Sequence, residues 1–526
     1  MAFLTKTLEQ LTLCFGVAGL IYLTGLFTTS YLSNLIFIPL VMSLVIACIP
    51  KEKEALLKEI ALVTASFTFL YSLLLWVFFN LQTPQFQYVE SFSYLFPMQD
   101  SKITIFLGVD GISMPLIILS NLLIFICLLS SWSSIKIYLK EYLIAFLVLE
   151  AFLVGAFAVL DLLIFYIFFE ATLLPMFIIV LIYGSRERKA RAANFLFLYT
   201  FFGSLFMLAA ILYIYSQFGT TNYLDLIYYC PMLSATESNF LWFAFFFSFA
   251  TKLPMIPFHI WLPEAHVEAP TAGSVILAGI LLKLGSYGMI RYALALLPSG
   301  ALYFTPLVYT LSILGVIYAS LTAIRQTDFK RIVAYSSVAH MSIVNIGIFA
   351  FNSIGLEGAL LQSVSHGFVA SALFLIIGVV YDRFHSRIVK YYGGLATYMP
   401  LYAIVFLFFT MANIALPGTS SFVGEILILA GSFKANTTVT FLGATGMILG
   451  GAYALWLANR ILYGNLKVDN GRLHLNYFYD LTRREIYVFL PLILGTLWLG
   501  IYPKPLLDVF HISVQFLVYL IQPFFL

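Results

Sequence analysis

Seven ionisable side chains lie inside long apolar stretches of the sequence, where a charge would face hydrocarbon rather than water. They are Glu150, Glu170, Lys252, Lys283, His340, His366 and Glu425. A charged group at bilayer depth costs about 2.5 to 3.5 kcal/mol on insertion scales, so it should face the protein interior and serve a function. Burial favours the neutral form of carboxyls and amines, which lets each gain or lose a proton near neutral pH. The set is therefore typical of a proton relay.

The two lysines are the strongest indication, since a single buried glutamate or histidine often serves only as a structural hydrogen-bonding group. That structural interpretation is preferred for Glu150 and His366 taken singly. A buried lysine must deprotonate or pair with a carboxylate, and its stem reaches water only from a helix end. Lys283 has 11 residues before it and 13 after it in its stretch, so reaching water would be strained. The residues interpreted as functional on these grounds are Glu170, Lys252, Lys283 and Glu425.

Helix-breaking residues occur next to two of these charges. Pro254 and Pro257 follow Lys252, and Pro417 precedes Glu425 by eight residues. Unwound backbone inside a membrane is tolerated only where protein or a water-filled cavity satisfies it, and broken helices often mark the ion site of a transporter. The alternative is an ordinary proline kink. The nearby charge favours the ion site.

His259 is a further candidate, seven residues after Lys252. On an unbroken helix the two would share a face about 10 Å apart, a gap that a water chain could bridge. The glycines around Lys283 and those at 443–451 lack the strand, turn and helix context of a nucleotide-binding loop. We interpret them as sites of close helix contact.

The elements that must position these groups are membrane helices. The chain has 526 residues, of which 62% are hydrophobic and only 10% charged, which excludes a soluble enzyme. Stretches long enough to cross a bilayer recur fifteen times. They are 11–27, 34–49, 60–79, 112–134, 142–159, 161–183, 193–216, 240–261, 272–296, 303–323, 330–350, 356–380, 400–433, 441–460 and 486–502.

The lysines and arginines support this division, because alternate breaks between the stretches hold 20 of the 27. The opposite side has four, namely Lys102, Lys434 and Lys504 outside the stretches and Arg291 near the end of the stretch 272–296. The side of the membrane that is rich in lysine and arginine, the basic side, faces the compartment of synthesis, either cytoplasm or mitochondrial matrix. The first stretch, 11–27, is interpreted as a retained helix rather than a signal sequence, because no small-residue cleavage site follows it.

Other function classes are disfavoured. A net charge of +3, distributed by loop, gives no electrostatic basis for binding nucleic acid. The four cysteines have no CxxC or His/Cys spacing, so we expect no metal centre, iron-sulfur cluster or disulfide framework. The longest breaks are too short to form a separate soluble domain.

Several long motifs carry a family resemblance. The most recognisable is PEAHVEAPTAGSV at 263–275, followed by LAGILLK at 277–283. Others match in order along the chain, namely GVDGIS at 108–113, FYIFFEATLLPMF at 165–177, AYSSVAHM at 334–341, SHGFVASALF at 365–374 and LPGTSSFVGE at 416–425. The chain resembles the chain 4 family of the proton-pumping NADH:ubiquinone oxidoreductase, respiratory complex I, and its mitochondrial, plant-like members most closely.

The resemblance implies an all-α polytopic fold, an antiporter-like bundle of fourteen transmembrane helices with two inverted five-helix repeats and two broken helices. An extra N-terminal helix would precede it, since residues 1–30 are not required by the family. The implied division is 1–33 extra apolar segment, 34–134 N-terminal helices, 142–296 first proton half-channel repeat, 303–460 second half-channel repeat, and 461–526 C-terminal helix and tail.

The resemblance also implies roles. Glu170 and Lys252 would be the charged pair of the first half-channel, and Lys283 the central link. His340 and His366 would carry protons across to Glu425, the terminal group. It gives Glu150 no firm role.

The implied protein is a proton-translocating subunit of an enzyme complex in the mitochondrial inner membrane, or alternatively the bacterial plasma membrane. It would hold no cofactor itself, with NADH, FMN, iron-sulfur clusters and ubiquinone in partner subunits. Partners would be other membrane-arm subunits, including neighbouring antiporter-like ones, and lipids.

Two alternatives remain from the residues alone. A stand-alone cation/proton antiporter would need the same buried lysines and glutamates, and only the motif matches disfavour it. A purely structural membrane scaffold would leave the two mid-membrane lysines unexplained.

Overall fold

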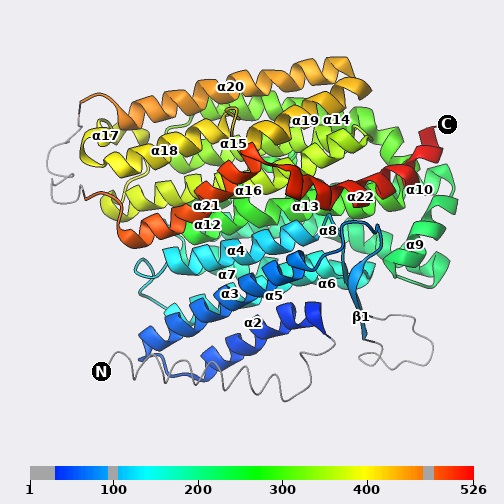
Figure 1. Ribbon diagram of the computed structural model, residues 1–526, viewed down its shortest axis with the longest axis horizontal. Helices are drawn as coiled ribbons and strands as arrows, with labels where there is room; N and C mark the ends of the chain where they lie inside the picture. Colours follow the sequence, from blue (N-terminus) through cyan, green and yellow to red (C-terminus); the bar gives the residue numbers. More distant parts are fainter. Residues whose placement is uncertain (1–29, 93–104, 466–478, 526) are drawn as a thin grey trace.

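The computed structural model describes residues 30–92, 105–465 and 479–525. Its long helices lie side by side with their axes roughly parallel (Figure 1). The predicted stretch 11–27 falls outside the described residues, so its interpretation as a retained helix stays a prediction.

The first half of the chain forms helices α2 to α10, interrupted by one β-hairpin. Their bounds are α2 Tyr31–Cys48, α3 Glu54–Val77, β1 Gln87–Phe92, β2 Ile105–Val109, α4 Met114–Ser130, α5 Leu139–Ala158, α6 Leu162–Ala171, α7 Leu173–Tyr183, α8 Lys189–Phe218, α9 Tyr223–Tyr229, the short η1 Cys230–Met232 and α10 Ala235–Lys252.

The second half is helical throughout its described part. Its bounds are η2 Phe258–Ile260, α11 Trp261–Glu268, α12 Thr271–Ile276, η3 Leu277–Leu281, α13 Leu282–Gly288, η4 Met289–Leu294, α14 Pro298–Arg325, α15 Phe329–Ile348, α16 Ser353–Phe384, η5 Val389–Tyr391, α17 Leu395–Tyr398, α18 Pro400–Asn413, α19 Ser420–Ala435, α20 Thr437–Leu462, α21 Arg483–Ile501, α22 Lys504–Ile521 and η7 Gln522–Phe525.

The helices confirm a polytopic membrane protein. Among the described residues, eleven helical segments are long and apolar enough to cross a membrane, and α4 and α18 are shorter apolar helices. Each predicted stretch from 34–49 to 486–502 overlaps a helix. The total of fourteen crossing helices stays a prediction.

Local sequence explains several helix ends. Ser234 and Glu237 form a capping box, in which each side chain satisfies the other's backbone donor, and this places the start of α10 at Ala235. Thr482 and Glu485 do the same for α21. The helix observed for the predicted stretch 240–261 begins five residues earlier than predicted, at Ala235, and ends at Lys252.

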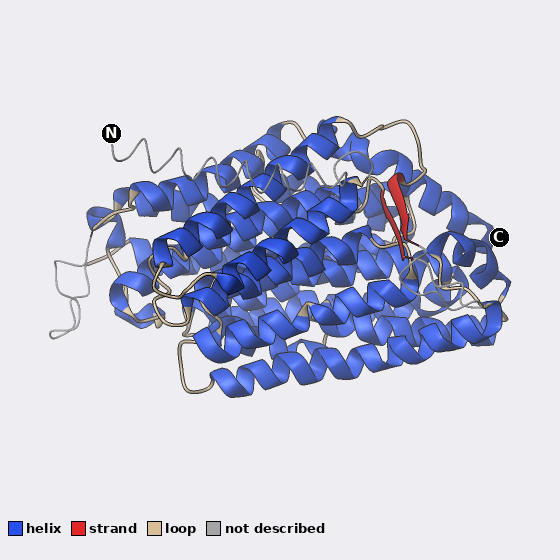
Figure 2. Cartoon of the chain, turned by 90° about the horizontal axis from the view of Figure 1, so that it is seen from below, coloured by secondary structure: helices blue, strands red, loops and turns tan. Residues whose placement is uncertain are grey.

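The β-hairpin is the one sheet in the described part of the chain (Figure 2). Its strands are antiparallel, with Glu90 opposite Leu107. The carboxylate of Glu90 accepts hydrogen bonds from the backbone N–H groups of Leu32 and Ser33, at 2.7 and 3.1 Å. A carboxylate at this position satisfies unpaired donors of the first turn of α2 and suits its helix dipole.

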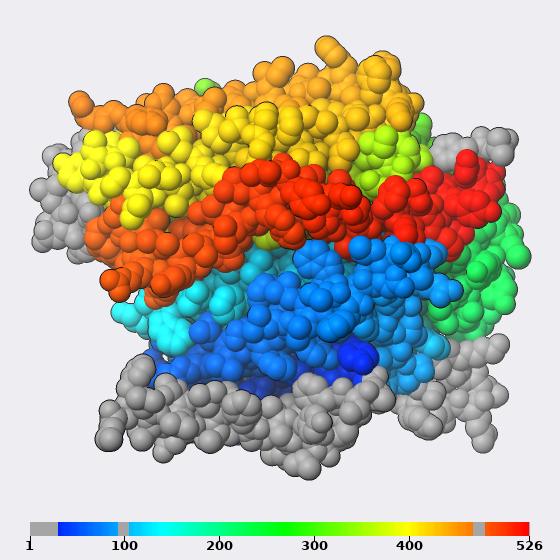
Figure 3. Space-filling model, in the orientation of Figure 1, coloured from blue at the N-terminus to red at the C-terminus, as the bar shows by residue number. Residues whose placement is uncertain are grey.

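Helix α22 was not among the predicted stretches. It continues from α21 across the front of the molecule, between the N-terminal helices and α18 to α20 (Figure 3). One face of α22 is buried and includes Val509, Phe510 and Val514. Polar residues recur every three or four positions on its exposed face, which lowered the hydropathy of the segment. They are Lys504, Asp508, His511 and Gln515.

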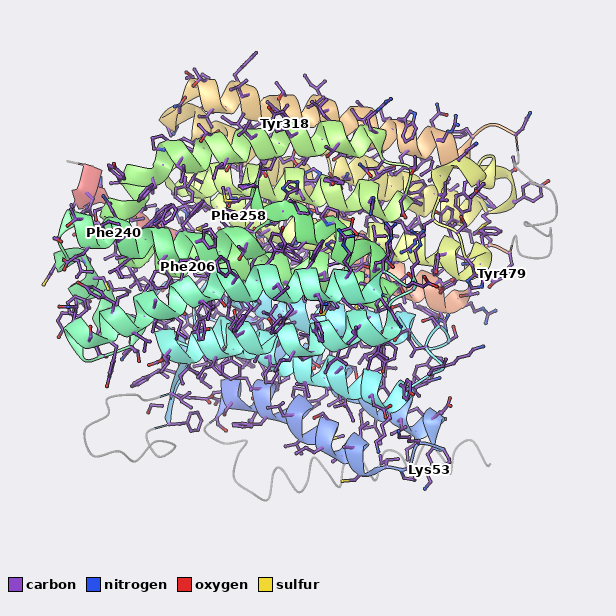
Figure 4. The ribbon with its side chains drawn as sticks, turned by 180° about the vertical axis from the view of Figure 1, so that it is seen from behind. Lys53, Phe206, Phe240, Phe258, Tyr318 and Tyr479 are labelled. Atoms are coloured by element: carbon purple, nitrogen blue, oxygen red, sulfur yellow. The ribbon has the colours of Figure 1, made fainter. Side chains whose placement is uncertain are left out.

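The outer surface of the bundle is rich in aromatic side chains. Phe206 of α8, Phe240 of α10 and Tyr318 of α14 lie on the side opposite α22 (Figure 4). Each is exposed, Phe240 by 80%. Such a surface is suited to lipid and would be unfavourable in water.

Candidate functional site

The first broken helix presents Lys252. Helix α10 ends at this residue, and regular helix resumes only at η2 and α11. Lys252 is 3% exposed. Its ammonium donates to the carbonyl oxygen of Phe169 at 2.8 Å and to the hydroxyl of Thr172 at 3.4 Å. It also lies 3.6 Å from the centroid of the Phe169 ring, which is cation–π contact.

Glu170, the expected partner of Lys252, lies beside it without forming an ion pair in the described structure. The lysine reaches the carbonyl of the preceding residue instead, at the junction where α6 ends and α7 begins. Electrostatic interaction between Glu170 and Lys252 is nevertheless present. One carboxylate oxygen of Glu170 is buried and has no hydrogen-bond partner among the described residues. Glu170 therefore borders the Lys252 site, while the hydrogen bonds of the lysine go to Phe169 and Thr172 on either side of it in the sequence.

Lys283 is completely buried in the segment that α12, η3 and α13 form. Its ammonium donates to the carbonyl oxygen of Ala278 at 2.6 Å and lies 2.8 Å from Nδ1 of His366 on α16. The carbonyl is accessible because residues 277–281 are wound as a π-helix, a local widening that is frequent at functional sites. A proton passing along the 2.8 Å contact would leave a neutral amine and an imidazolium.

The contacts continue from His366 to the second broken helix. The rings of His366 and His340 have centroids 5.9 Å apart, a separation that one water molecule can bridge. Nδ1 of His340 lies 2.9 Å from Oε1 of Glu425, and the amide of Gln362 donates to the same oxygen at 3.1 Å. Glu425 is 2% exposed and lies on α19, just beyond the break that follows α18. Both broken helices are therefore confirmed, each with a buried charge beside the break.

Two candidates lie apart from this series. The break after Lys252 removes the shared helix face on which His259 was expected, and His259 instead faces the ring of Tyr335, with centroids 6.4 Å apart. Glu150 is fully buried on α5 and accepts a hydrogen bond from the hydroxyl of Thr68 at 2.5 Å. Its second carboxylate oxygen has no partner among the described residues.

Sequence reasoning missed two contributors. Gln362 occupies the position four residues before His366, so it shares that helix face, and an amide within an apolar run was the available signal. Thr172 was not expected either, since a hydroxyl can satisfy itself on its own helix and gives no sign of a distant partner.

Gly285 brings the central helix against the first break. A Cβ added at Gly285 would lie 2.9 Å from the backbone nitrogen of Leu253. Only glycine allows this approach, because the obstacle is backbone and cannot rotate away. The contact holds the Lys283 helix beside Lys252.

We expect Gly285→Ala to destabilise the membrane subunit by about 1 to 3 kcal/mol, the usual cost of overpacking a well-filled interior. Thermal inactivation of the purified assembly would measure it. Gly451→Ala is the matched control, since its added Cβ would meet the nearest described atom at 3.7 Å. Equal stability of the two variants would contradict the close approach at Gly285.

Comparison with known proteins decides the family. The family described as "NADH:quinone oxidoreductase/Mrp antiporter, TM" matches residues 159–450. The NADH-ubiquinone oxidoreductase chain 4 of Marchantia polymorpha is 54% identical over 93% of this chain and 97% of its own length. That of Arabidopsis thaliana is 53% identical with the same coverages.

The chain belongs to the chain 4 family of NADH-ubiquinone oxidoreductase. A solved structure of respiratory complex I from Thermus thermophilus with bound NADH contains a chain of the same fold, with a TM-score of 0.82 and 27% identity. The match covers 93% of this chain and 99% of that one. The chain 4 family membership confirms the resemblance and the antiporter-like fold class, and it disfavours a stand-alone antiporter.

Proposed function

We propose that protons cross the interior of this subunit through the series Lys283, His366, His340 and Glu425. The observation that carries the proposal is the order of these groups, in which contacts of 2.8 and 2.9 Å lie on either side of two neighbouring imidazoles whose centroids are 5.9 Å apart. Each member can bind and release a proton. The carboxylate at one end and the amine at the other are both shielded from water, so charge moves only as protons move.

As a member of the chain 4 family, the protein is a proton-translocating membrane-arm subunit of NADH:ubiquinone oxidoreductase and lies in the mitochondrial inner membrane as a multi-pass protein. It is thus part of an enzyme. We further propose that NADH, FMN, the iron-sulfur clusters and ubiquinone are bound by partner subunits, so that redox energy arrives here through protein contacts. Neighbouring antiporter-like subunits and lipids are the proposed partners within the membrane.

Lys252 and Glu170 supply the second part of the proposal. The ammonium of Lys252 donates to the carbonyl of Phe169 and lies over the ring of the same residue. The next residue, Glu170, has a carboxylate oxygen without a hydrogen-bond partner among the described residues. Closing this pair would favour charged Lys252, and opening it would favour release of its proton toward Lys283. In this scheme 142–296 and 303–460 act as two half-channels, with Lys283 between them. His259 would act in the first half-channel at the α11 side of the break.

His366→Gln tests the proposal at its middle. The glutamine amide oxygen can still accept a hydrogen bond from Lys283, but it cannot carry a proton at accessible pH. We expect the assembled complex to oxidise NADH and pump protons at a rate lowered about a hundredfold, the usual contribution of a positioned proton-transfer group. Lumen acidification in vesicles would measure pumping, and Glu187→Gln, an exposed change in the loop between α7 and α8, serves as a control for preparation of the complex. Parental pumping by an assembled His366→Gln complex would remove His366 from the route.

A further inference from the structure

A second cluster of buried charges lies between Lys283 and the basic side of the membrane. It forms where α11, α12 and α15 meet the loop after α16. Lys330, at the start of α15, is 2% exposed. Its ammonium donates to the carbonyl oxygen of Ala269 at 2.7 Å and to the hydroxyl of Ser274 at 3.1 Å. Ser274 in turn donates to the carbonyl oxygen of His266 at 3.0 Å.

Glu268 provides the carboxylate of this cluster. It is 2% exposed, and its Oε2 has no hydrogen-bond partner among the described residues. Its backbone carbonyl accepts from the N–H of Ser185, in the basic-side loop between α7 and α8. The guanidinium of buried Arg387 donates to the carbonyl of Val267, one residue away. The charged groups that act on Lys330 electrostatically are Arg387, Asp328, Glu268 and Asp382.

His266 lies between this cluster and the central lysine. Its ring stacks on Phe374, with centroids 4.7 Å apart and an angle of 5° between the planes. The ring is fully buried, and within the described structure neither nitrogen has a hydrogen-bond partner. It lies within electrostatic range of Lys330, Lys283 and His366. Buried polar atoms are normally paired, so two unpaired ring nitrogens here need an explanation.

The orientation of the Lys283 side chain indicates a role for the unpaired ring nitrogens of His266. Its ammonium bonds the carbonyl of Ala278, five residues nearer the basic-side start of its own helix at Thr271. The side chain thus extends back toward the basic side, in the direction of His266. Because the π-helix at 277–281 exposes that carbonyl, the backbone itself sets this direction.

We propose that Glu268, Lys330 and His266 form the route by which Lys283 takes up protons from the basic side. This inference rests on the proposed function. Lys330 gives a proton to one ring nitrogen of His266, and the other nitrogen releases one toward Lys283. Glu268, having bound a proton from basic-side water, restores the proton of Lys330. Each step breaks one O–H or N–H bond and forms another, so one proton enters and no other group is consumed.

The neighbouring surface offers a matched control. Glu264 lies one turn before Glu268 on α11, and Arg331 follows Lys330 on α15. These two form an ion pair of 2.7 Å, with side chains 28% and 32% exposed. Glu264→Gln and Glu268→Gln therefore make the same chemical change on the same helix, one at the surface and one in the buried cluster.

The test uses the complete oxidoreductase in vesicles, with the basic side facing an external buffer of adjustable pH and NADH added there. Lumen acidification per NADH oxidised is followed as the external pH is raised. For Glu268→Gln we expect pumping close to the parent at low pH and a loss of about tenfold or more at high pH, where uptake becomes limiting. Glu264→Gln should follow the parent profile.

His266→Phe keeps the ring stacked on Phe374 and cannot carry a proton. This variant tests the uptake route even if the Glu268→Gln complex fails to assemble. We expect it to show the same loss of proton pumping at high external pH. Parental profiles for both variants would overturn the proposal, and so would a loss that is equal at every pH, since that indicates a structural role. Lys283→Met is run in parallel. Normal pumping by Lys283→Met would contradict the proposed function. Loss of pumping in Lys283→Met, with parental profiles for Glu268→Gln and His266→Phe, would contradict the uptake route alone.

Discussion

Lys283→Met is expected to abolish proton pumping by the assembled complex, with a loss of about a hundredfold or more. The methionine stem fills most of the same space in a fully buried site, so assembly should persist. What disappears is the ammonium that lies 2.8 Å from Nδ1 of His366. Without it, the hydrogen-bonded contact between the Lys283 helix and the histidine series is lost.

Lys283→Arg sharpens this expectation. Arginine keeps the positive charge but does not deprotonate at accessible pH, so it should fail nearly as completely as methionine. Proton pumping and NADH oxidation in vesicles measure both variants, and native gel electrophoresis reports assembly. Pumping retained by Lys283→Arg would mean that the residue supplies a fixed charge, and the proton-carrying role would be wrong.

Glu425 should show the second large effect. Glu425→Ala is expected to lower pumping about a hundredfold, because it removes the proton acceptor of His340 and leaves Gln362 without its partner. Glu425→Gln keeps the shape and hydrogen-bonding capacity but cannot bind and release a proton, so it should fail to a similar extent. Glu425→Asp shortens the reach by one methylene and should retain partial pumping.

The comparison of Glu425→Gln with Glu425→Asp separates chemistry from structure. The measurement is the pumping rate of the assembled complexes in vesicles. We expect the parent to pump fastest, Glu425→Asp more slowly, and Glu425→Gln and Glu425→Ala most slowly, at similar rates. If Gln equals the parent while Asp is impaired, Glu425 is a structural hydrogen-bonding residue, and the end of the series must lie elsewhere.

The amino-acid sequence by itself determined the class of protein, most helices and the groups that could carry protons. Hydrophobic stretches long enough for a bilayer are a local property, and so is the cost of a charge such as Lys283 within one. Proline likewise acts on its own helix, which is why the breaks beside Lys252 and Glu425 could be predicted. Motif resemblance then ordered these groups into a relay.

Only the tertiary structure decided which groups meet. His366 and Lys283 are 83 residues apart in the chain, and His340 and Glu425 are 85 apart, so no local pattern specifies their 2.8 and 2.9 Å contacts. The expected ion pair of Glu170 with Lys252 gave way to the carbonyl of Phe169, because a backbone oxygen at the α6–α7 junction lies within the lysine's reach. Helix α22 was missed because its hydrophobicity lies on one face, and only its neighbours show which face is buried. The cluster of Glu268, Lys330 and His266 was missed for a related reason. In the sequence Lys330 belongs to a polar break, and only its contacts with Ala269 and Ser274 show that it is buried. Sequence periodicity describes one helix at a time, whereas a proton route is a property of several helices in contact.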